Sequence, residues 1–235
     1  MDIAEKVLRA KTDLDDVYEA GKKAEYDEFW DEYQGNGSLK SYSGAFSGGC
    51  WNEKNFKPKY DIIANNAQNM FWCNTMNIDL VEYLDAIGIK LDTSNSINNS
   101  AMFSFSNFTR VGVIDFTKVN SSYSTFSDST KLKTIDKIIY HDKLVLTTAF
   151  TRCTALENLI VEGTIGQNGF DIHWSTKLSA DSLKSIINAL STTTTGLTIT
   201  LPTTAQSNYE AVYGSGSWTT LVATRSNWTI AYTKA

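Results

Sequence analysis

Residues 91–116 are LDTSNSINNSAMFSFSNFTRVGVIDF, and the pattern of this stretch returns along the chain in weaker form. Four stretches place a phenylalanine, preceded by Met, Thr or Ala, ahead of regularly spaced apolar residues; these are Phe71, Phe103, Phe126 and Phe150. The phenylalanines are 32, 23 and 24 residues apart (71 to 103, 103 to 126, 126 to 150). Self-similarity at such a period is typical of solenoid proteins, in which neighbouring repeats bury one another.

The residues after each phenylalanine predict what one repeat contains. Apolar side chains recur about three positions apart, in the sets Phe108, Val111 and Ile114; Leu132, Ile135 and Ile138; and Leu156, Leu159 and Val161. We expect each repeat to form one short strand, at 113–116, 137–140 and 158–162, and to bury one phenylalanine. The predicted structural anchors of residues 61–170 are Phe71, Phe103, Phe126, Phe150, Leu132 and Leu156. The alternative is chance recurrence within an aromatic-rich α+β domain.

Two segments precede the repeats, and one lies between the first two phenylalanines. Apolar residues in 1–34 alternate at spacings of four and three, which predicts an amphipathic helix. This helix either docks or oligomerises the protein, or it lies on the following domain; its stripe is too short to hold a dimer alone. Residues 35–60 are rich in glycine and aromatic side chains, which indicates a linker or an N-terminal cap. The long first interval contains an extra amphipathic turn, LVEYLDAIGIK (80–90).

Residues 171–235 break the repeat and predict a capping unit. Apolar residues between 178 and 190 fit one helical face, and Ser179 is a suitable N-cap because its hydroxyl can accept a first-turn amide hydrogen. Alternating apolar residues predict strands at 197–201 and 228–232, with a further helix between them. A solenoid needs such a terminal unit to cover its last open face. The predicted fold class is therefore an α/β (α+β) solenoid with an N-terminal helix and a C-terminal helix–strand cap.

The composition limits the classes of function. The net charge is 21 − 26 = −5, which argues against a nucleic-acid partner because phosphate contacts need a basic face. No apolar run approaches about 18 residues, so we expect no membrane insertion. The first residues lack the apolar core of a signal peptide, so we expect no export by that route. With 3 cysteines, 2 histidines and no phosphate-binding loop, the chain indicates no disulfide framework, no metal site and no cofactor.

Two patterns in the sequence are catalytic candidates. Residues 45–49, Ala-Phe-Ser-Gly-Gly, are related to a nucleophile elbow in which Ser47 would need His141 or His173 as its base. An elbow requires a strand before the serine and a helix after it, and neither pattern is present here. Acidic clusters at 13–16 and 25–32 offer paired carboxylates, but their place on a predicted helix favours a solvated face. A cell-surface hydrolase is therefore only the minor alternative function.

The stretch at 91–116 resembles the BspA-type leucine-rich repeats of bacterial surface proteins. Their units have a D-T-S lead, an M-F pair and an L-x-x-I-D line, which correspond here to Asp92, Thr93, Ser94, Met102, Phe103 and Asp115. The units at Phe126 and Phe150 keep the phenylalanine but lack the Met and the D-T-S lead. The resemblance covers residues 60–170 and implies that the solenoid is a short, degenerate leucine-rich-repeat stack.

A second resemblance spans nearly the whole chain. Residues 17–34 and 44–62 are similar to the openings of phage-encoded tail or baseplate-region proteins of gut Firmicutes. That group has a helical head, degenerate BspA-type repeats and a closing helix–strand unit, matched here by SLKSIINAL (182–190) and SNWTIAY (226–232). This resemblance implies a structural or host-contact role in a virion rather than a known reaction.

The sequence therefore favours a non-enzymatic interaction module. In a phage tail, the expected partners are other virion proteins or a host cell-surface protein or glycan, with residues 1–34 available for homo-oligomerisation. The alternative is a bacterial BspA-like adhesin at the cell surface. The predicted contact surface is the exposed strand face of residues 111–162, and the candidate binding residues are Tyr123, Tyr140, His141, His173 and Trp174. No residue is predicted to be catalytic or to bind a metal.

Overall fold

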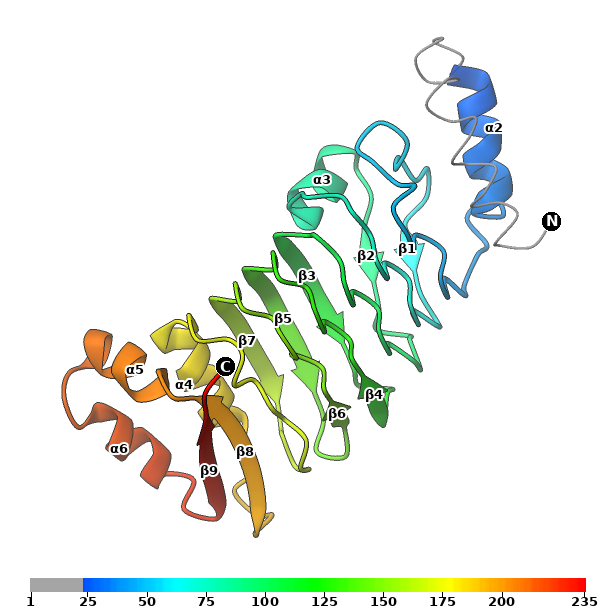
Figure 1. Ribbon diagram of the computed structural model, residues 1–235. Coiled ribbons are helices and arrows are strands. Elements are labelled where there is room, and N and C mark those ends of the chain that lie inside the picture. The colour runs from blue at the N-terminus through cyan, green and yellow to red at the C-terminus, as the bar shows by residue number, and fades with distance from the viewer. Residues whose placement is uncertain (1–22) are drawn as a thin grey trace.

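The computed structural model describes residues 23–235 and shows an elongated mixed α/β molecule (Figure 1). Short coils of chain follow one another along the long axis, from α2 (Lys23–Tyr33) at one end to α5 (Ala205–Tyr213) and α6 (Ser217–Ala223) at the other. The strands form several small parallel sheets, none of them closed. Among the described residues, no helix is both long enough and apolar enough to cross a membrane.

One side of the coils carries most of the strands. β1 (Ile62–Ile63) pairs with β2 (Leu91–Asp92), and β3 (Arg110–Asp115), β5 (Thr134–Tyr140) and β7 (Asn158–Gly163) form a sheet in the order β3-β5-β7. All pairs are parallel, so the chain leaves each strand, passes around one coil and returns in the same direction. The predicted strands are thus present, although β3 and β5 begin three residues earlier than expected.

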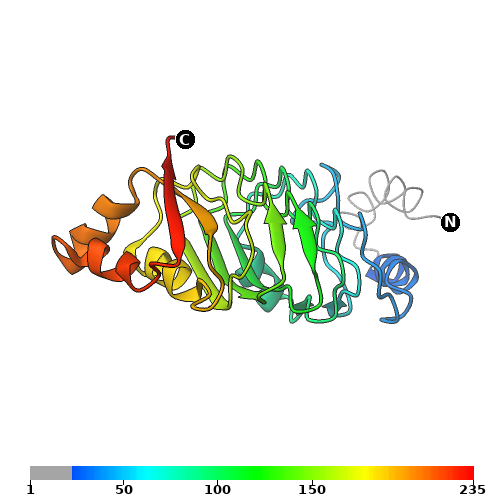
Figure 2. The same ribbon diagram turned by 90° about the horizontal axis from the view of Figure 1, so that it is seen from below.

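A second, smaller sheet lies on another side of the coils. β4 (Ser121–Tyr123) pairs with β6 (Val145–Thr147), and Figure 2 shows these two parallel strands side by side in the middle of the stack. Ser122 and Leu146 are buried, whereas Tyr123 and Thr147 are exposed. The sequence did not predict these strands, because three residues are too few to display an alternating pattern.

The phenylalanines of successive coils stack face to face in the core. The ring centroids are 5.3 Å apart for Phe71 and Phe103, 5.7 Å for Phe103 and Phe126, and 5.6 Å for Phe126 and Phe150, with interplanar angles of 6°, 4° and 13°. Phe46 extends the row by one coil, 5.3 Å from Phe71, so residues 35–60 contain a further coil. None of these rings is more than 1% exposed, so the row is a continuous part of the hydrophobic core.

The backbone repeats the same turn around each of these phenylalanines. Both the residue two positions before the phenylalanine and the residue two positions after it have a positive φ. The first set is Gly44, Asn69, Ala101, Ser124 and Thr148, and the second is Gly48, Cys73, Phe105, Asp128 and Arg152. A left-handed conformation is uncommon for a residue with a side chain. Its recurrence shows that five coils share one turn geometry, and we call this five-residue turn the phenylalanine arch.

Thr148 is the least favourable residue in these two sets, because β-branched side chains tolerate a positive φ poorly. Its φ is 53°, and Asn69 adopts 54° at the equivalent position. We expect Thr148→Asn to raise the free energy of unfolding by about 0.5–1 kcal/mol in urea denaturation. Thr147→Asn is the matched control, since Thr147 lies in β6, where asparagine is disfavoured. A gain from both substitutions would contradict the explanation.

Side chains from one arch satisfy buried carbonyl groups of the preceding arch. Ser129 donates to the carbonyl oxygen of Phe103 over 2.5 Å, and Cys153 Sγ lies 3.0 Å from the carbonyl oxygen of Phe126. Burial raises the pKa of the Cys153 thiol to about 12, so this group is a neutral donor. Ser129 and Cys153 each stand three residues after the phenylalanine of their own arch. The arches are therefore joined by polar as well as aromatic contacts.

Aromatic side chains close the N-terminal end of the stack. Trp30 and Tyr33 of α2 pack on Phe46, Trp51 and Phe56, with ring centroids 5.1–6.5 Å apart. All five side chains are at most 4% exposed. The cluster covers the apolar surface that the first coil would otherwise expose.

α2 is the part of the helix predicted at 1–34 that the structure describes. Residues 1–22, which carry most of the predicted heptad stripe, lie outside the described residues. Asp31 was expected on a solvated face, but it accepts hydrogen bonds from Lys59 and Tyr60, each over 2.7 Å. These hydrogen bonds hold the pKa of Asp31 below its usual value, and the bond from Lys59 has a larger effect than the bond from Tyr60. One acidic residue of the predicted cluster thus joins α2 to the first coil.

At the other end, α4 (Ala180–Ala189) takes the place of a strand beside β7. The predicted N-cap is confirmed, because the Ser179 side chain accepts a hydrogen bond from the Ser182 amide. Ser182 and Ser185 turn their hydroxyls to β7 and accept its Leu159 and Val161 amide hydrogens, each over 2.8 Å. A helix therefore satisfies the strand edge that would otherwise be open to pairing.

Ser182→Ala is expected to lower the free energy of unfolding by about 1–3 kcal/mol, because it leaves the buried Leu159 amide without a partner. Urea denaturation measures the loss. Asn188→Ala is the control on the same helix, since Asn188 is exposed and alanine favours a helix. If both variants have the wild-type midpoint, the serine does not stabilise the edge of β7.

The chain ends in a further parallel pair. β8 (Leu197–Pro202) pairs with β9 (Trp228–Thr233), with α5 and α6 between them in sequence. The predicted strands and the predicted helix around Trp218 are present. α5 was not predicted, because its sequence AQSNYEAVY buries only Ala205 and Tyr209 and displays no clear apolar stripe.

Candidate functional site

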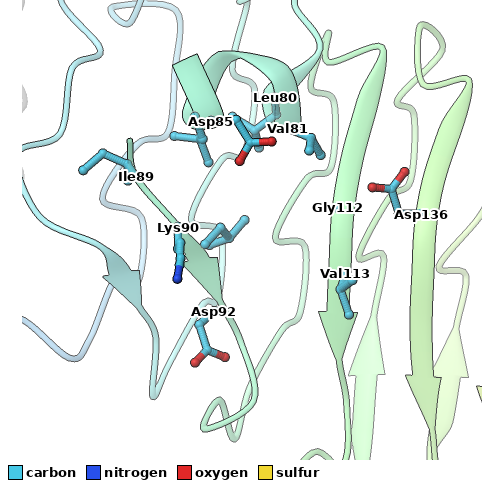
Figure 3. A pocket seen from close by; sticks show the side chains of 11 residues that line it. Leu80, Val81, Asp85, Ile89, Lys90, Asp92, Gly112, Val113 and Asp136 are labelled. Atoms are coloured by element: carbon cyan, nitrogen blue, oxygen red, sulfur yellow. The ribbon is translucent and has the colours of Figure 1, made fainter. Parts of the chain in front are cut away.

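A pocket of about 400 Å³ opens where the strand-bearing side of the stack is interrupted (Figure 3). β2 and β3 lie in neighbouring coils but do not pair, so the β1-β2 sheet ends and the β3-β5-β7 sheet begins at this place. α3 (Leu80–Ala86) lies at one rim of the pocket. Most of the lining is apolar: Leu80, Val81, Leu84, Ile89, Leu91 and Val113. The volume is within the usual range of small-ligand pockets.

The pocket exists because the chain makes an excursion between two points of contact with β3. Asp79 forms an isolated bridge with Arg110 at the start of β3, and its side chain caps α3 by accepting from the Glu82 amide over 2.9 Å. The chain returns through β2, and Thr93 Oγ1 accepts the Asp115 amide hydrogen over 2.8 Å at the other end of β3. The predicted amphipathic turn at 80–90 is thus the helical excursion that produces the pocket.

One group of charges near the pocket is paired through Arg110. Arg110 makes two hydrogen bonds to Asp136, of 2.6 and 2.9 Å, and lies 3.5 Å from Asp79. These contacts raise the pKa of Arg110, and the hydrogen bonds to Asp136 have the largest effect. Asp85 and Lys90 are exposed at the rim. The arrangement can accept an apolar group, but it does not concentrate charge on one point.

The second candidate is the solvent side of β4 and β6 together with residues 66–68 and 98–100 of the two preceding coils, which we call the β4–β6 face. Tyr123 is its largest exposed side chain, with 53% of its surface accessible. The Tyr123 amide donates to Ser100 Oγ over 3.4 Å, and the Tyr123 hydroxyl lies 3.5 Å from Gln68 Nε2. Asn98 Nδ2 donates to Gln68 Oε1 over 3.2 Å. This face is therefore a connected polar surface around one aromatic ring.

Two further aromatic residues are exposed at the arches. Trp72 is 44% exposed and Phe105 is 51% exposed, while the neighbouring phenylalanines Phe71 and Phe103 are fully buried. Phe105 holds a φ of 58°, which a bulky side chain seldom adopts. These two residues form no ring contact with the β4–β6 face among the described residues.

Tyr140 is not a surface residue, so the prediction that it contacts a partner is wrong. It is 3% exposed, its hydroxyl donates to the Leu144 carbonyl over 3.0 Å, and burial raises its pKa. The pairing of β5 with β7 is irregular between Ile135 and Ile138. This irregularity allows Ile135 and Ile138, which are three residues apart, to point inward together, and Tyr140 follows on the same side as Ile138.

The remaining candidate residues are half-buried, and both histidines contact other residues of the protein. His141 Nε2 lies 2.9 Å from the Val119 carbonyl oxygen. His173 Nδ1 lies 2.6 Å from Asp171, and its ring centroid is 5.1 Å from that of Trp174. Nothing in residues 23–235 joins the His173 group to Tyr123 by a hydrogen bond, an ion pair or a ring contact. The five predicted binding residues therefore do not form one site.

The structure does not bring Ser47 together with either histidine. The Ser47 hydroxyl donates to the Gly44 carbonyl over 2.8 Å inside the first arch. The arches at Phe71 and Phe103 lie between it and the coil that carries His141, and His173 follows later still. Within the described part of the chain, no three His, Cys, Asp or Glu side chains are grouped so that they could hold a metal ion.

Sequence reasoning missed Gln68 and Asn98, although a signal for one of them was present. Gln68 stands three residues before Phe71, and Tyr123 stands three residues before Phe126. Equivalent positions in successive coils share a face, so counting back from each phenylalanine would have placed Gln68 on the same face as the exposed tyrosine. Asn98 shows no such signal, because nothing marks the segment before Phe103 as a strand.

Together these features define a mixed α/β protein of small parallel sheets with a pocket on one side and a polar face on another. No family model, no curated protein and no solved structure matches the chain.

Proposed function

We propose that residues 61–170 form a short, degenerate leucine-rich-repeat solenoid between an N-terminal cap and a C-terminal helix–strand cap. The parallel pairing of β3, β5 and β7 supports the proposal, as does the recurring phenylalanine arch. In a solenoid each repeat is stabilised by its neighbours. The buried anchors Leu132 and Leu156 fit this role, together with the phenylalanines.

We propose that this solenoid is a non-enzymatic interaction module and a structural protein of a phage tail or baseplate. The row of stacked phenylalanine rings carries the proposal, because it commits the equivalent position of each coil to packing and leaves the outer faces to a partner. That partner is another virion protein or a component of the host surface. The position of Ser47 in the first arch weighs against a hydrolase.

Retention on a cell surface tests the binding role. Fluorescently labelled full-length protein is expected to bind purified cell walls of the bacterium that carries the gene, and unlabelled protein is expected to displace it. The walls are expected to release no soluble sugar or peptide above a protein-free control. Walls that are degraded would contradict an interaction module that catalyses no reaction, and protein that is not retained would exclude the host wall as its partner.

Electron microscopy tests the virion assignment. Antibody against the protein is expected to decorate the tail end of phage particles induced from a strain that carries the gene. If the antibody instead decorates the intact bacterial surface and leaves the phage particles unlabelled, the adhesin-like alternative is supported.

A further inference from the structure

We propose that Tyr123, Gln68 and Asn98 form a binding site for a neutral glycan, with one sugar ring stacked on the tyrosine. The inference rests on the proposed function, because it names the partner of one outer face. The orientation of Tyr123, the amide groups beside it and the uncharged β4–β6 face suit such a ligand.

The contacts of Tyr123 show that its ring lies along the stack. Backbone hydrogen bonds show which coils are neighbours. The amides of Ala67 and Asn69 donate to the carbonyl oxygens of the next coil, at Asn98 and Ser100. The Ala101 amide of that coil donates to the Tyr123 carbonyl oxygen of the following one. The backbone of Gln68 is therefore two coils, or about 10 Å, from that of Tyr123. Because the Tyr123 hydroxyl reaches Gln68, the ring must extend across the small, buried Ser100 between them.

This orientation turns one face of the ring to solvent. The side chain is 53% exposed, although its hydroxyl and its backbone amide both have partners on the protein. An aromatic side chain held in this way loses little conformational freedom when a ligand binds. Its π-face is electron-rich and attracts the weakly positive C–H groups that one side of a pyranose ring presents.

Two carboxamides stand next to the ring. Asn98 Nδ2 donates to Gln68 Oε1, and Gln68 Nε2 faces the Tyr123 hydroxyl. Each amide nitrogen carries two hydrogens, so each retains a second donor after these bonds. Asn98 Oδ1 is fixed by the Ser100 amide over 3.0 Å, which sets the orientation of its amide group. Fixed amide donors beside an aromatic face suit the hydroxyl oxygens of a sugar.

The face carries no charge. Residues 66–68, 98–100, 121–124 and 145–148 contain no Asp, Glu, Lys or Arg. The Ser124 and Thr148 hydroxyls lie 3.0 Å apart at its border and add further neutral hydrogen-bonding groups. A charged polymer would therefore gain no electrostatic attraction from this face, whereas a neutral polyhydroxylated chain does not depend on such attraction. A protein partner is less well matched, because protein interfaces bury an apolar centre and this face offers a single ring.

The test uses the full-length protein and defined hexasaccharides. Cellohexaose, laminarihexaose and maltohexaose are the neutral probes, a hyaluronan hexasaccharide is the charged one, and saturation-transfer NMR with titration reports binding. At least one neutral probe is expected to bind, and the charged probe is expected to bind at least about tenfold more weakly. Tyr123→Ala is expected to weaken binding at least about tenfold, whereas Tyr123→Phe, which keeps the ring, is expected to stay within about threefold.

Phe105→Ala is the matched control, since it removes another half-exposed aromatic side chain outside the β4–β6 face. It is expected to leave the affinity within about twofold. If no neutral probe binds, or if Tyr123→Ala binds as well as the wild type, the proposal is overturned. Wall retention separates this failure from that of the proposed function. Retention lost after protease but kept after periodate oxidation of sugars would reject the glycan and keep the binding role.

Discussion

Phe103→Ala is expected to lower the free energy of unfolding by about 3–5 kcal/mol, as measured by urea denaturation. Phe103 is fully buried, with Phe71 stacked 5.3 Å away on one side and Phe126 5.7 Å away on the other. Phe108 also meets it edge to face at 6.1 Å. The arches hold the backbone on both sides, so the neighbouring rings cannot collapse into the cavity that alanine would leave.

The control for this prediction lies two residues further along the chain. Phe105→Ala removes a ring of the same size that is 51% exposed, and we expect a change of less than about 0.5 kcal/mol. The Phe103 variant is also expected to unfold less cooperatively, because stability in a stack of coils depends on contacts between neighbours. Equal losses from the two substitutions would show that the ring row does not stabilise the fold.

Gly163→Ala is the second substitution with a large expected effect. It is expected to lower the free energy of unfolding by at least about 3 kcal/mol. Gly163 ends β7 with a φ of +96°, and a Cβ built there would lie 1.9 Å from the Tyr140 carbonyl oxygen. The obstructing atom belongs to the backbone of the paired strand β5 and cannot rotate away. Alanine therefore has to separate the ends of the two strands or change the conformation at 163.

Gly196→Ala separates the steric effect from the conformational one. Gly196 also has a positive φ, of +73°, but no atom lies within 4 Å of the position that its Cβ would take. The Gly196→Ala variant is expected to lose about 1 kcal/mol of unfolding free energy, because alanine has to adopt a left-handed conformation. Thermal and urea denaturation of the two variants measure the difference. A loss at Gly163 no larger than that at Gly196 would mean that the strands separate without cost.

The repeating part of the fold could be predicted because it depends on large side chains at a regular spacing. Phe103, Phe126 and Phe150 are buried at equal positions, and the strands that follow them lie within three residues of their predicted places. The short strands β4 and β6 could not be predicted, since their pairing depends on neighbouring coils rather than on their own sequence. The coil at Phe46 was missed because glycines around it obscured the pattern that later coils show.

The candidate sites depend on details that a sequence does not contain. Tyr123 could be predicted as an exposed aromatic residue, but its orientation across Ser100 follows from contacts two coils apart. Tyr140 was misplaced although alternation along the predicted strand 137–140 places it on the same side as the apolar Ile138. The pocket beside β3 follows from the path of residues 79–92, in which sequence indicated only an amphipathic turn.

The constancy of the phenylalanine arch has a consequence for how such a chain can change over time. The interval between Phe71 and Phe103 is eight or nine residues longer than the next two (32 against 24 and 23), yet the rings of all three intervals stay 5.3–5.7 Å apart. The additional residues form α3 and leave the arches unaltered. Insertions elsewhere along a coil can therefore create new surfaces and hollows while the aromatic column, on which folding depends, stays in register.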